Sequence, residues 1–224
     1  MKNSIILSIS LCCASIACAQ VPSTTELNPT QLETFLKKLP SGDVARGENI
    51  HKQRMCAGCH GAEGVAAGNN PSLAGQPVAV NAKSLMEYRD GWRNGPGMAM
   101  MMVNFSKPLK DQDIADLAAY YAAKPIPSAE EKLGDAPSLV FQGDRKRLIT
   151  PCASCHGTEG KGNENGLVPY IAGQNQAYLD LTLKQYRADQ RRSDVLQEMR
   201  AFAKKLTDEE ISALSQYYSK PKKQ

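Results

Sequence analysis

Apolar residues recur at helical spacing near the end of each half of the chain. They are Ile114, Leu117, Ala118 and Tyr121 in the first half and Ile211, Leu214, Tyr217 and Tyr218 in the second. Intervals of three and four residues place such side chains on one face of a helix. The pattern therefore predicts an amphipathic helix towards the end of each half.

Two further segments of the first half are also predicted to be helical. Residues 43–54 precede a cysteine-containing motif, and residues 80–90 follow it. No stretch shows the alternation of apolar and polar positions that predicts a strand. We therefore expect an all-α protein.

The start of the second amphipathic helix carries a capping signal. Thr207 is followed three residues later by Glu210, which is the spacing of a capping box. The corresponding residue in the first half is Lys110, a poor N-cap, so Asp111 is expected to cap that helix instead.

The chain contains an internal repeat. The sequence C-A-G-C-H-G that begins at Cys56 recurs as C-A-S-C-H-G at Cys152. The other matched positions are Gly47 and Gly143, Ala74-Gly75-Gln76 and Ala172-Gly173-Gln174, Tyr88-Arg89 and Tyr186-Arg187, and Tyr120-Tyr121 and Tyr217-Tyr218. Self-similarity of this kind predicts two tandem copies of one small domain.

The chain is divided by three features. They are the repeat, the two prolines that end the first domain's last helix, and the apolar run near the start of the chain. The predicted parts are a signal peptide at 1–19, an N-terminal extension at 20–42, a first domain at 43–124, a linker at 125–136 and a second domain at 137–224.

The first residues read as an export signal. Lys2 is followed by an apolar run over 5–17 and by the small-residue cleavage site Ala17-Cys18-Ala19. The run is too short to cross a bilayer, and no later segment is long and apolar enough. A lipid anchor on Cys18 is the alternative, but Ser15 stands where a lipobox usually has leucine.

The repeated C-x-x-C-H motif carries the chemistry. Its residues are Cys56, Cys59 and His60 in the first copy and Cys152, Cys155 and His156 in the second. The two thiols of such a motif can add to the vinyl groups of a haem, while the adjacent histidine binds the iron. A thioredoxin-like redox pair or half a zinc site would not need that histidine in both copies. The sequence therefore predicts two covalently bound haem c groups.

A methionine in each half is predicted to complete the iron coordination. Met199 lies seven residues before Leu206, and the same count back from Leu109 selects Met102. Methionine fills the sixth position and raises the potential of the iron, whereas an open position would permit oxygen or peroxide chemistry. The neighbouring residues Met98, Met100 and Met101 are interpreted as flexible packing.

Four residues near the motifs have weaker assignments. Pro71 and Pro169 could each present a backbone carbonyl to the other nitrogen of the ligating histidine, or form an ordinary rigid turn. His51 is a conceivable metal ligand but is interpreted as solvated or packed. Trp92 could shield the first haem or simply pack.

Charge excludes one class of partner. The chain has 27 basic and 23 acidic residues, so it is only slightly basic, and the propionates of two haems would bring the loaded protein close to neutral. Nothing in this balance predicts nucleic-acid binding.

Three features lie within residues 43–220: the two C-x-x-C-H motifs, the Pro-x-Leu/Ile-Ala-Gly-Gln loops and the stretch from Met199 to Leu206. Together they resemble the cytochrome c4 family of periplasmic dihaem proteins. The resemblance implies two class I cytochrome c folds about a pseudo-twofold axis, with His/Met ligation of both irons. It also implies that electrons pass from a quinol-oxidising cytochrome bc complex toward a terminal oxidase, often of the cbb3 type.

Three functions are compatible with two haem-binding domains in one chain. A freely diffusing dihaem carrier, which is not an enzyme, is favoured over a cytochrome subunit of a dehydrogenase complex, in which residues 20–42 could be a docking arm. A dihaem peroxidase is disfavoured, because both halves offer a methionine at the same register.

Overall fold

A computed structural model describes residues 28–66, 68–95, 97–127, 135–162 and 166–219, so the predicted signal peptide lies outside the described residues. Within those ranges the only regular elements are helices, together with two isolated β-bridges, which confirms the all-α prediction. In chain order the helices are α1 (Pro29–Lys38), α2 (Val44–Gln53), α3 (Ala57–His60), α4 (Val78–Arg89), α5 (Met98–Ser106), α6 (Asp111–Ala122), α7 (Ser138–Phe141), α8 (Ala153–His156), α9 (Gln176–Arg187), the 3-10 helix η1 (Val195–Gln197), α10 (Glu198–Ala203) and α11 (Asp208–Tyr218).

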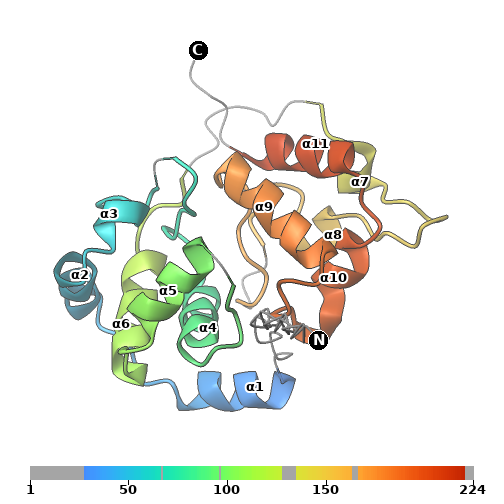
Figure 1. Ribbon diagram of the computed structural model, residues 1–224. Helices are drawn as coiled ribbons and strands as arrows, with labels where there is room; N and C mark the ends of the chain where they lie inside the picture. Colours follow the sequence, from blue (N-terminus) through green and yellow to red (C-terminus); the bar gives the residue numbers. More distant parts are fainter. Residues whose placement is uncertain (1–27, 67, 96, 128–134, 163–165, 220–224) are drawn as a thin grey trace, which may run out of the picture.

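The helices form two lobes that lie side by side (Figure 1). The first lobe holds α2 to α6, and the second holds α7 to α11. In the first lobe α6 packs against α2 and α4, and in the second α11 packs against α9. The order of elements is thus repeated, with α3, α4 and α6 matched by α8, α9 and α11.

The two amphipathic helices supply much of each core, as their pattern predicts. Ile114 and Ile211 are fully buried at corresponding places in α6 and α11. The capping box of α11 is confirmed: the amide of Glu210 donates to Thr207 Oγ1 at 3.2 Å, and the amide of Thr207 donates to a Glu210 oxygen at 2.9 Å. Helix α4 begins two residues earlier than predicted, at Val78, which is exposed and therefore outside the apolar pattern.

The start of α6 differs from its prediction. Asp111 is not the N-cap but the first residue of the helix, and its carboxylate accepts a bond from Arg89 at 2.6 Å. The helix start is held instead by the Asp113 carboxylate, which accepts from the amide of Lys110 at 3.0 Å. One half of a capping box therefore suffices here, because the acidic side chain reaches back to the cap residue.

The lobes are not equivalent upstream of the motif. Gly47 lies within α2, where a Cβ would collide with the backbone of Asp116 on α6. Gly143 instead has a φ of +66° in the turn after the single-turn helix α7, next to the bridge between Asp144 and Ile149. The match of Gly47 with Gly143 is therefore wrong as a structural equivalence: one glycine serves close helix packing and the other a left-handed turn.

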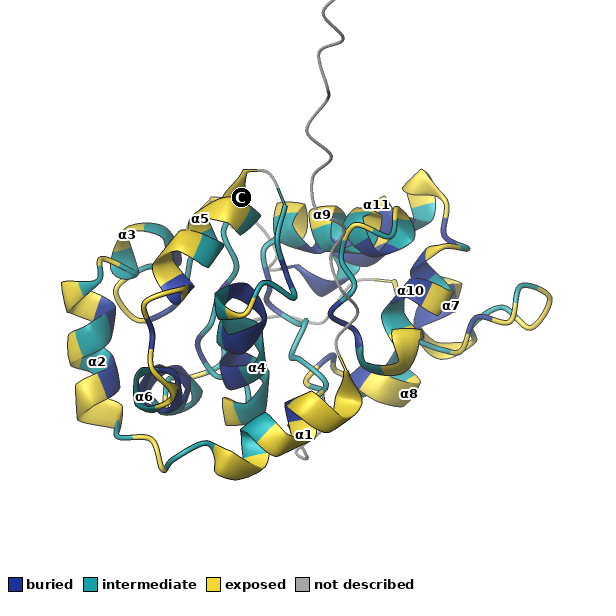
Figure 2. Ribbon diagram, turned by 60° about the horizontal axis from the view of Figure 1, so that its bottom comes forward, coloured by how far each residue is buried: buried dark blue, intermediate teal, exposed yellow. Residues whose placement is uncertain are grey.

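Helix α1 lies within the predicted N-terminal extension, where sequence analysis assigned no element. Asn28 caps it by accepting from the amide of Thr30 at 2.9 Å. Leu32 is buried against Met86 of α4, while the outward face of α1 is exposed (Figure 2). The residues packed around this pair are Phe35, Leu36, Trp92 and Val195. Because Val195 belongs to the second lobe, α1 contributes to the junction of both lobes.

Replacing Leu32 with alanine is expected to lower the free energy of unfolding by about 2–5 kcal/mol, the usual cost of truncating a buried leucine. The measurement is denaturant unfolding of the haem-loaded protein followed by circular dichroism. Thr34→Ala, at an exposed position of the same helix, is the matched control and should change stability by less than about 0.5 kcal/mol. Equally small effects in both variants would contradict the docking of α1.

Candidate haem centres

Each C-x-x-C-H motif forms one helical turn that stops directly after its histidine. Cys56 and Cys152 precede α3 and α8 with nearly identical backbone angles. Gly61 and Gly157 follow the histidines, and each has a φ of +76°. Glycine adopts this left-handed conformation without strain, so the chain can turn away at once and leave the imidazole facing the interior.

The motif histidines are fixed by the loops that sequence analysis singled out. His60 Nδ1 lies 2.9 Å from the carbonyl oxygen of Pro71, and His156 Nδ1 lies 3.1 Å from that of Pro169. A carbonyl can only accept, so each Nδ1 carries the proton and each Nε2 has a free lone pair. The side chains are 7% and 8% exposed, and this burial lowers the pKa of both histidines. Both rings are therefore held as neutral imidazoles, the form that binds a metal.

The four motif cysteines form no disulfide with one another. Cys56, Cys59 and Cys152 are half-buried and Cys155 is exposed. Burial raises the pKa of the Cys56 and Cys152 thiols. Two thiols on one helical turn, next to a histidine with an available Nε2, are the donor set of a covalently attached haem, so the residues present fit that group.

Burial distinguishes the methionines of the first lobe. Met98, Met100 and Met101 are 48%, 49% and 44% exposed, whereas Met102 is half-buried on the same helix, α5. Met199 is likewise half-buried, on α10. The two methionines that the repeat register selects therefore share an environment that the exposed neighbours of Met102 lack.

The segment before Met199 is held by an ion pair that sequence analysis missed. Arg200 donates its amide and its Nε to the Asp194 carboxylate at 2.8 and 2.7 Å, and both side chains are buried. Between them the chain passes through left-handed backbone at Leu196 and Gln197. The only sequence signal was two opposite charges six residues apart, which does not indicate burial.

A second missed feature lies where the lobes meet. The guanidinium of Arg93 lies 4.6 Å from the ring centroid of Tyr88, and that of Arg191 lies 4.7 Å from that of Tyr186. Each arginine follows its tyrosine by five residues, so the repeat contained this signal. The charges of Arg93 and Arg191 outweigh the opposing effect of burial and lower the pKa of Tyr178 to about 7.

The same region contains a buried pair on α4. The Glu87 carboxylate accepts from Lys83, which also donates to the carbonyl of Ser193 in the second lobe at 2.7 Å. Together with Arg93 and Arg191, this cluster has three cationic groups, and the carboxylates near them are those of Glu87 and Glu198. It can therefore hold further anionic groups, such as the carboxylates of haem propionates.

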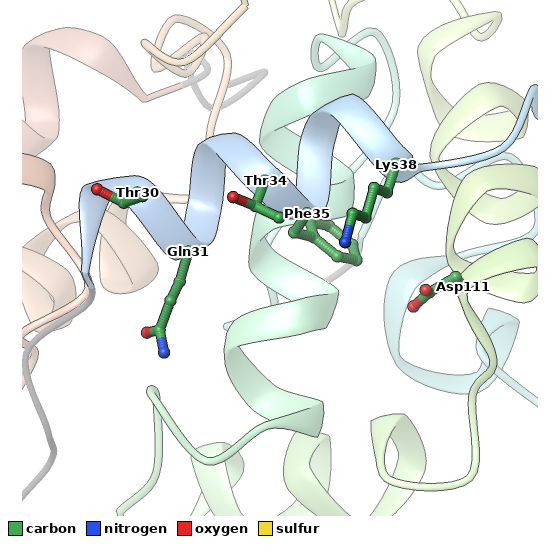
Figure 3. A pocket seen from close by; sticks show the side chains of 6 residues that line it. All are labelled: Thr30, Gln31, Thr34, Phe35, Lys38 and Asp111. Carbon is green, nitrogen blue, oxygen red and sulfur yellow. The ribbon is translucent and has the colours of Figure 1, made fainter.

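His51 and Trp92, which the sequence also singles out, both pack against other side chains. His51 is fully buried and hydrogen-bonded to the Tyr121 hydroxyl at 2.8 Å, as its packing interpretation predicts. Trp92 packs beside Leu32 and Met86. A surface hollow along α1 contains none of the predicted haem-binding residues (Figure 3). It is lined by Thr30, Gln31, Thr34, Phe35, Lys38 and Asp111.

Asp194→Ala is expected to lower the free energy of unfolding of the second lobe by about 1.5–3 kcal/mol, because it removes two charge-assisted hydrogen bonds to Arg200 while Asp189 still pairs with that guanidinium. Thermal unfolding of the haem-loaded protein measures this loss. Glu159→Ala removes an exposed pair with Lys161 in the same lobe and should cost at most about 1 kcal/mol. If both variants melt alike, the Asp194 pair does not hold this segment.

Both halves of the chain are similar to known proteins. The family model for cytochrome c matches residues 44–122 and 146–220. Cytochrome c4 of Azotobacter vinelandii is 34% identical over 191 residues, covering 79% of this chain and 88% of that protein. The thiosulfate dehydrogenase electron acceptor of Stutzerimonas stutzeri (strain A1501) is 32% identical over 191 residues, covering 79% and 86%. The crystal structure of reduced recombinant cytochrome c4 from Pseudomonas stutzeri is similar with a TM-score of 0.68 and 30% identity, over 80% of this chain and 99% of that one.

These similarities span most of the chain, and both halves match the same family model. They confirm two tandem class I cytochrome c domains and two covalently bound haem c groups. The chain therefore belongs to the cytochrome c4 family and is a dihaem electron-transfer protein.

Proposed function

We propose that the protein is an electron carrier with two closed iron sites. In the first site Cys56 and Cys59 attach the haem, and His60 and Met102 bind its iron. The corresponding residues of the second site are Cys152, Cys155, His156 and Met199. The observation that carries this proposal is the pair of histidines, each buried with Nδ1 bonded to a proline carbonyl and Nε2 left for a metal.

The chain's own residues orient the iron ligands and exclude water. The haem supplies the group that takes up and releases one electron. Pro71 and Pro169 fix the histidine rings. Met102 and Met199, which are half-buried, would fill the coordination position that a reacting molecule needs. A filled sixth position supports electron transfer and argues against peroxide chemistry, so we favour a carrier over an enzyme.

Arg93 and Arg191 are proposed to bind haem propionates between the lobes. Both guanidinium groups stack on tyrosine rings, and the nearby Glu87 carboxylate already pairs with Lys83. Buried or partly buried positive charge needs an anionic partner, and each haem brings two carboxylates.

Two electron-transfer routes are proposed. The first runs from a quinol-oxidising cytochrome bc complex to a terminal oxidase, for example of the cbb3 type, and follows from membership of the family. The second delivers electrons from a dehydrogenase. It is favoured by the relative whose name makes it the electron acceptor of thiosulfate dehydrogenase.

We also propose that residues 1–19 direct export to the periplasm. No helix in the described part of the chain is long and apolar enough to cross a membrane. Any contact with membrane complexes would then be peripheral. Packing of Leu32 within the chain occupies the apolar face of α1, so only the polar face of that helix would be available as a docking arm for a dehydrogenase.

Met102→Ala and Met199→Ala are each expected to abolish half of one weak absorption band. This band lies at the red end of the visible spectrum of the oxidised protein and requires a bond between iron and the methionine sulfur. Each variant should also create one high-spin iron that binds cyanide, because alanine leaves the sixth position open. Absorption spectra of the oxidised protein measure both effects. Met100→Ala is the matched control, since Met100 is exposed on the same helix as Met102. A spectrum unchanged by Met102→Ala would show that another group binds the first iron.

The route is tested by stopped-flow reduction of the oxidised protein. Purified cytochrome bc complex with quinol and purified thiosulfate dehydrogenase with thiosulfate are compared as donors at the same ionic strength. Rapid reduction by the bc complex alone supports the respiratory route, and rapid reduction by the dehydrogenase alone supports the second. Failure of both donors would overturn both routes while leaving the carrier chemistry intact.

A further inference from the structure

Two glutamines form reciprocal hydrogen bonds between the lobes. Gln76 of the first lobe donates to the carbonyl of Tyr170 at 2.7 Å and accepts from the amide of Tyr170 at 3.0 Å. Gln174 of the second lobe donates to the carbonyl of Ser72 at 2.9 Å and accepts from the amide of Ser72 at 2.8 Å. The two glutamines occupy matching positions of the repeat, and we call these four residues the glutamine clasp.

The clasp contacts the peptide groups that orient the haem ligands. The N–H of Ser72 and the carbonyl of Pro71 belong to one peptide group, and that carbonyl accepts from His60 Nδ1. An unbroken chain of bonds therefore runs from Gln174 through this peptide group to His60. In the opposite direction, Gln76 reaches His156 through the N–H of Tyr170 and the carbonyl of Pro169.

We propose that Gln76 and Gln174 are positioning residues, each of which tunes the haem ligand of the opposite lobe. This inference rests on the proposed roles of His60 and His156 as iron ligands. Gln174 acts on the first haem, and Gln76 acts on the second.

The physical basis is polarisation along a hydrogen-bond chain. When a peptide N–H donates to a glutamine oxygen, the carbonyl of the same peptide becomes a stronger acceptor, by roughly 10–30% per bond in condensed phase. The clasp is sheltered from water, since Gln76 and Gln174 are 8% and 6% exposed. A stronger acceptor on Nδ1 makes the imidazole a more basic ligand, which favours ferric iron. Each glutamine should therefore lower the potential of the opposite haem.

The clasp is held in register by the chain between the lobes. Gly75 and Gly173, which precede the two glutamines, both have a φ of +71°. A Cβ on Gly75 would collide with Ile126, and one on Gly173 would collide with the backbone of Pro127. The linker start thus packs against both glutamine loops, and only glycine fits at these two positions.

Within its own lobe, each glutamine is held by its backbone amide. The amide of Gln76 donates to the carbonyl of Leu73 at 3.3 Å, and that of Gln174 donates to the carbonyl of Ile171 at 3.2 Å. These are backbone bonds, which survive a change of side chain. Gln174 Oε1 also accepts one bond within its own lobe, from the amide of Asn175 at 2.9 Å, against two side-chain bonds across the lobes. A side-chain substitution should therefore act across the lobes more than within its own lobe.

The test uses the haem-loaded full chain and the variants Gln76→Met and Gln174→Met, which keep side-chain length but remove the hydrogen bonds. Proton NMR assigns each haem to its lobe and follows the Nδ1–H signals of His60 and His156, while a redox titration gives the two potentials. We expect Gln174→Met to shift the His60 signal and to favour ferrous iron in the first haem by up to about tenfold, or ~59 mV for one electron. Gln76→Met should do the same to His156 and the second haem.

Gln76→Glu and Gln174→Glu retain the acceptor oxygen and are the second pair of variants. They should leave the opposite potential close to that of the unmodified protein. A glutamic acid kept protonated by burial still accepts from the Tyr170 or Ser72 amide through its carbonyl oxygen, and it donates to the carbonyl of the same residue through its hydroxyl. Asn175→Ser is the matched control: it removes a bond to the carbonyl of Gly68 across the same junction but retains a residue able to cap α9. It should leave both potentials unchanged.

The outcomes distinguish a failure of the glutamine clasp proposal from a failure of the proposed iron ligands. If the unmodified protein shows no haem-shifted imidazole signal for His60 or His156, the ligand assignment fails. If both signals are present but the Gln→Met variants shift both haems equally, shift only the haem of their own lobe, or shift neither, the clasp does not tune across the lobes. Only the crossed pattern supports the proposal.

Discussion

The hydrogen bond from each motif histidine to a proline carbonyl is the contact on which the rest of the structure depends. It fixes the tautomer of a buried imidazole and leaves Nε2 as the only metal-binding atom of the ring. The single-turn helices α3 and α8, the left-handed glycines that end them and the proline loops all serve to bring these two atoms together. A neutral histidine held in this way presents Nε2 to a metal without first having to reorganise.

The two halves share the histidine side of the site but differ elsewhere. In the second lobe the segment before Met199 is tied down by the Asp194–Arg200 pair, whereas the corresponding part of the first lobe has left-handed glycines at Gly95 and Gly97. The helix before the motif is also long in one lobe and a single turn in the other. Since haem potentials depend on the surroundings of the ligands, these differences allow the two irons to have different potentials.

The junction between the lobes is polar as well as apolar. Glutamine amides, arginines stacked on tyrosines and the Lys83–Glu87 pair meet there. Helix α1 adds Leu32 to an apolar cluster that also contains Met86 of the first lobe and is packed by Val195 of the second. Buried polar groups require partners of definite geometry, so such a junction fixes one relative placement of the lobes more sharply than apolar contact alone. That placement also determines which peptide groups the clasp can reach.

The sequence by itself determined the helical class, the repeat, the motif residues and the register of the methionines, because helical periodicity and fixed motif spacing are local properties of the chain. It predicted the capping box at Thr207 but misplaced the cap of α6, since Asp113 reaches back from within the helix. It gave no sign of α1, whose apolar residues are meaningful only beside Met86 and Val195. The Asp194–Arg200 pair and the glutamine clasp were decided by tertiary structure alone, because burial and a partner about 100 residues away decide whether a polar side chain is solvated or part of a site.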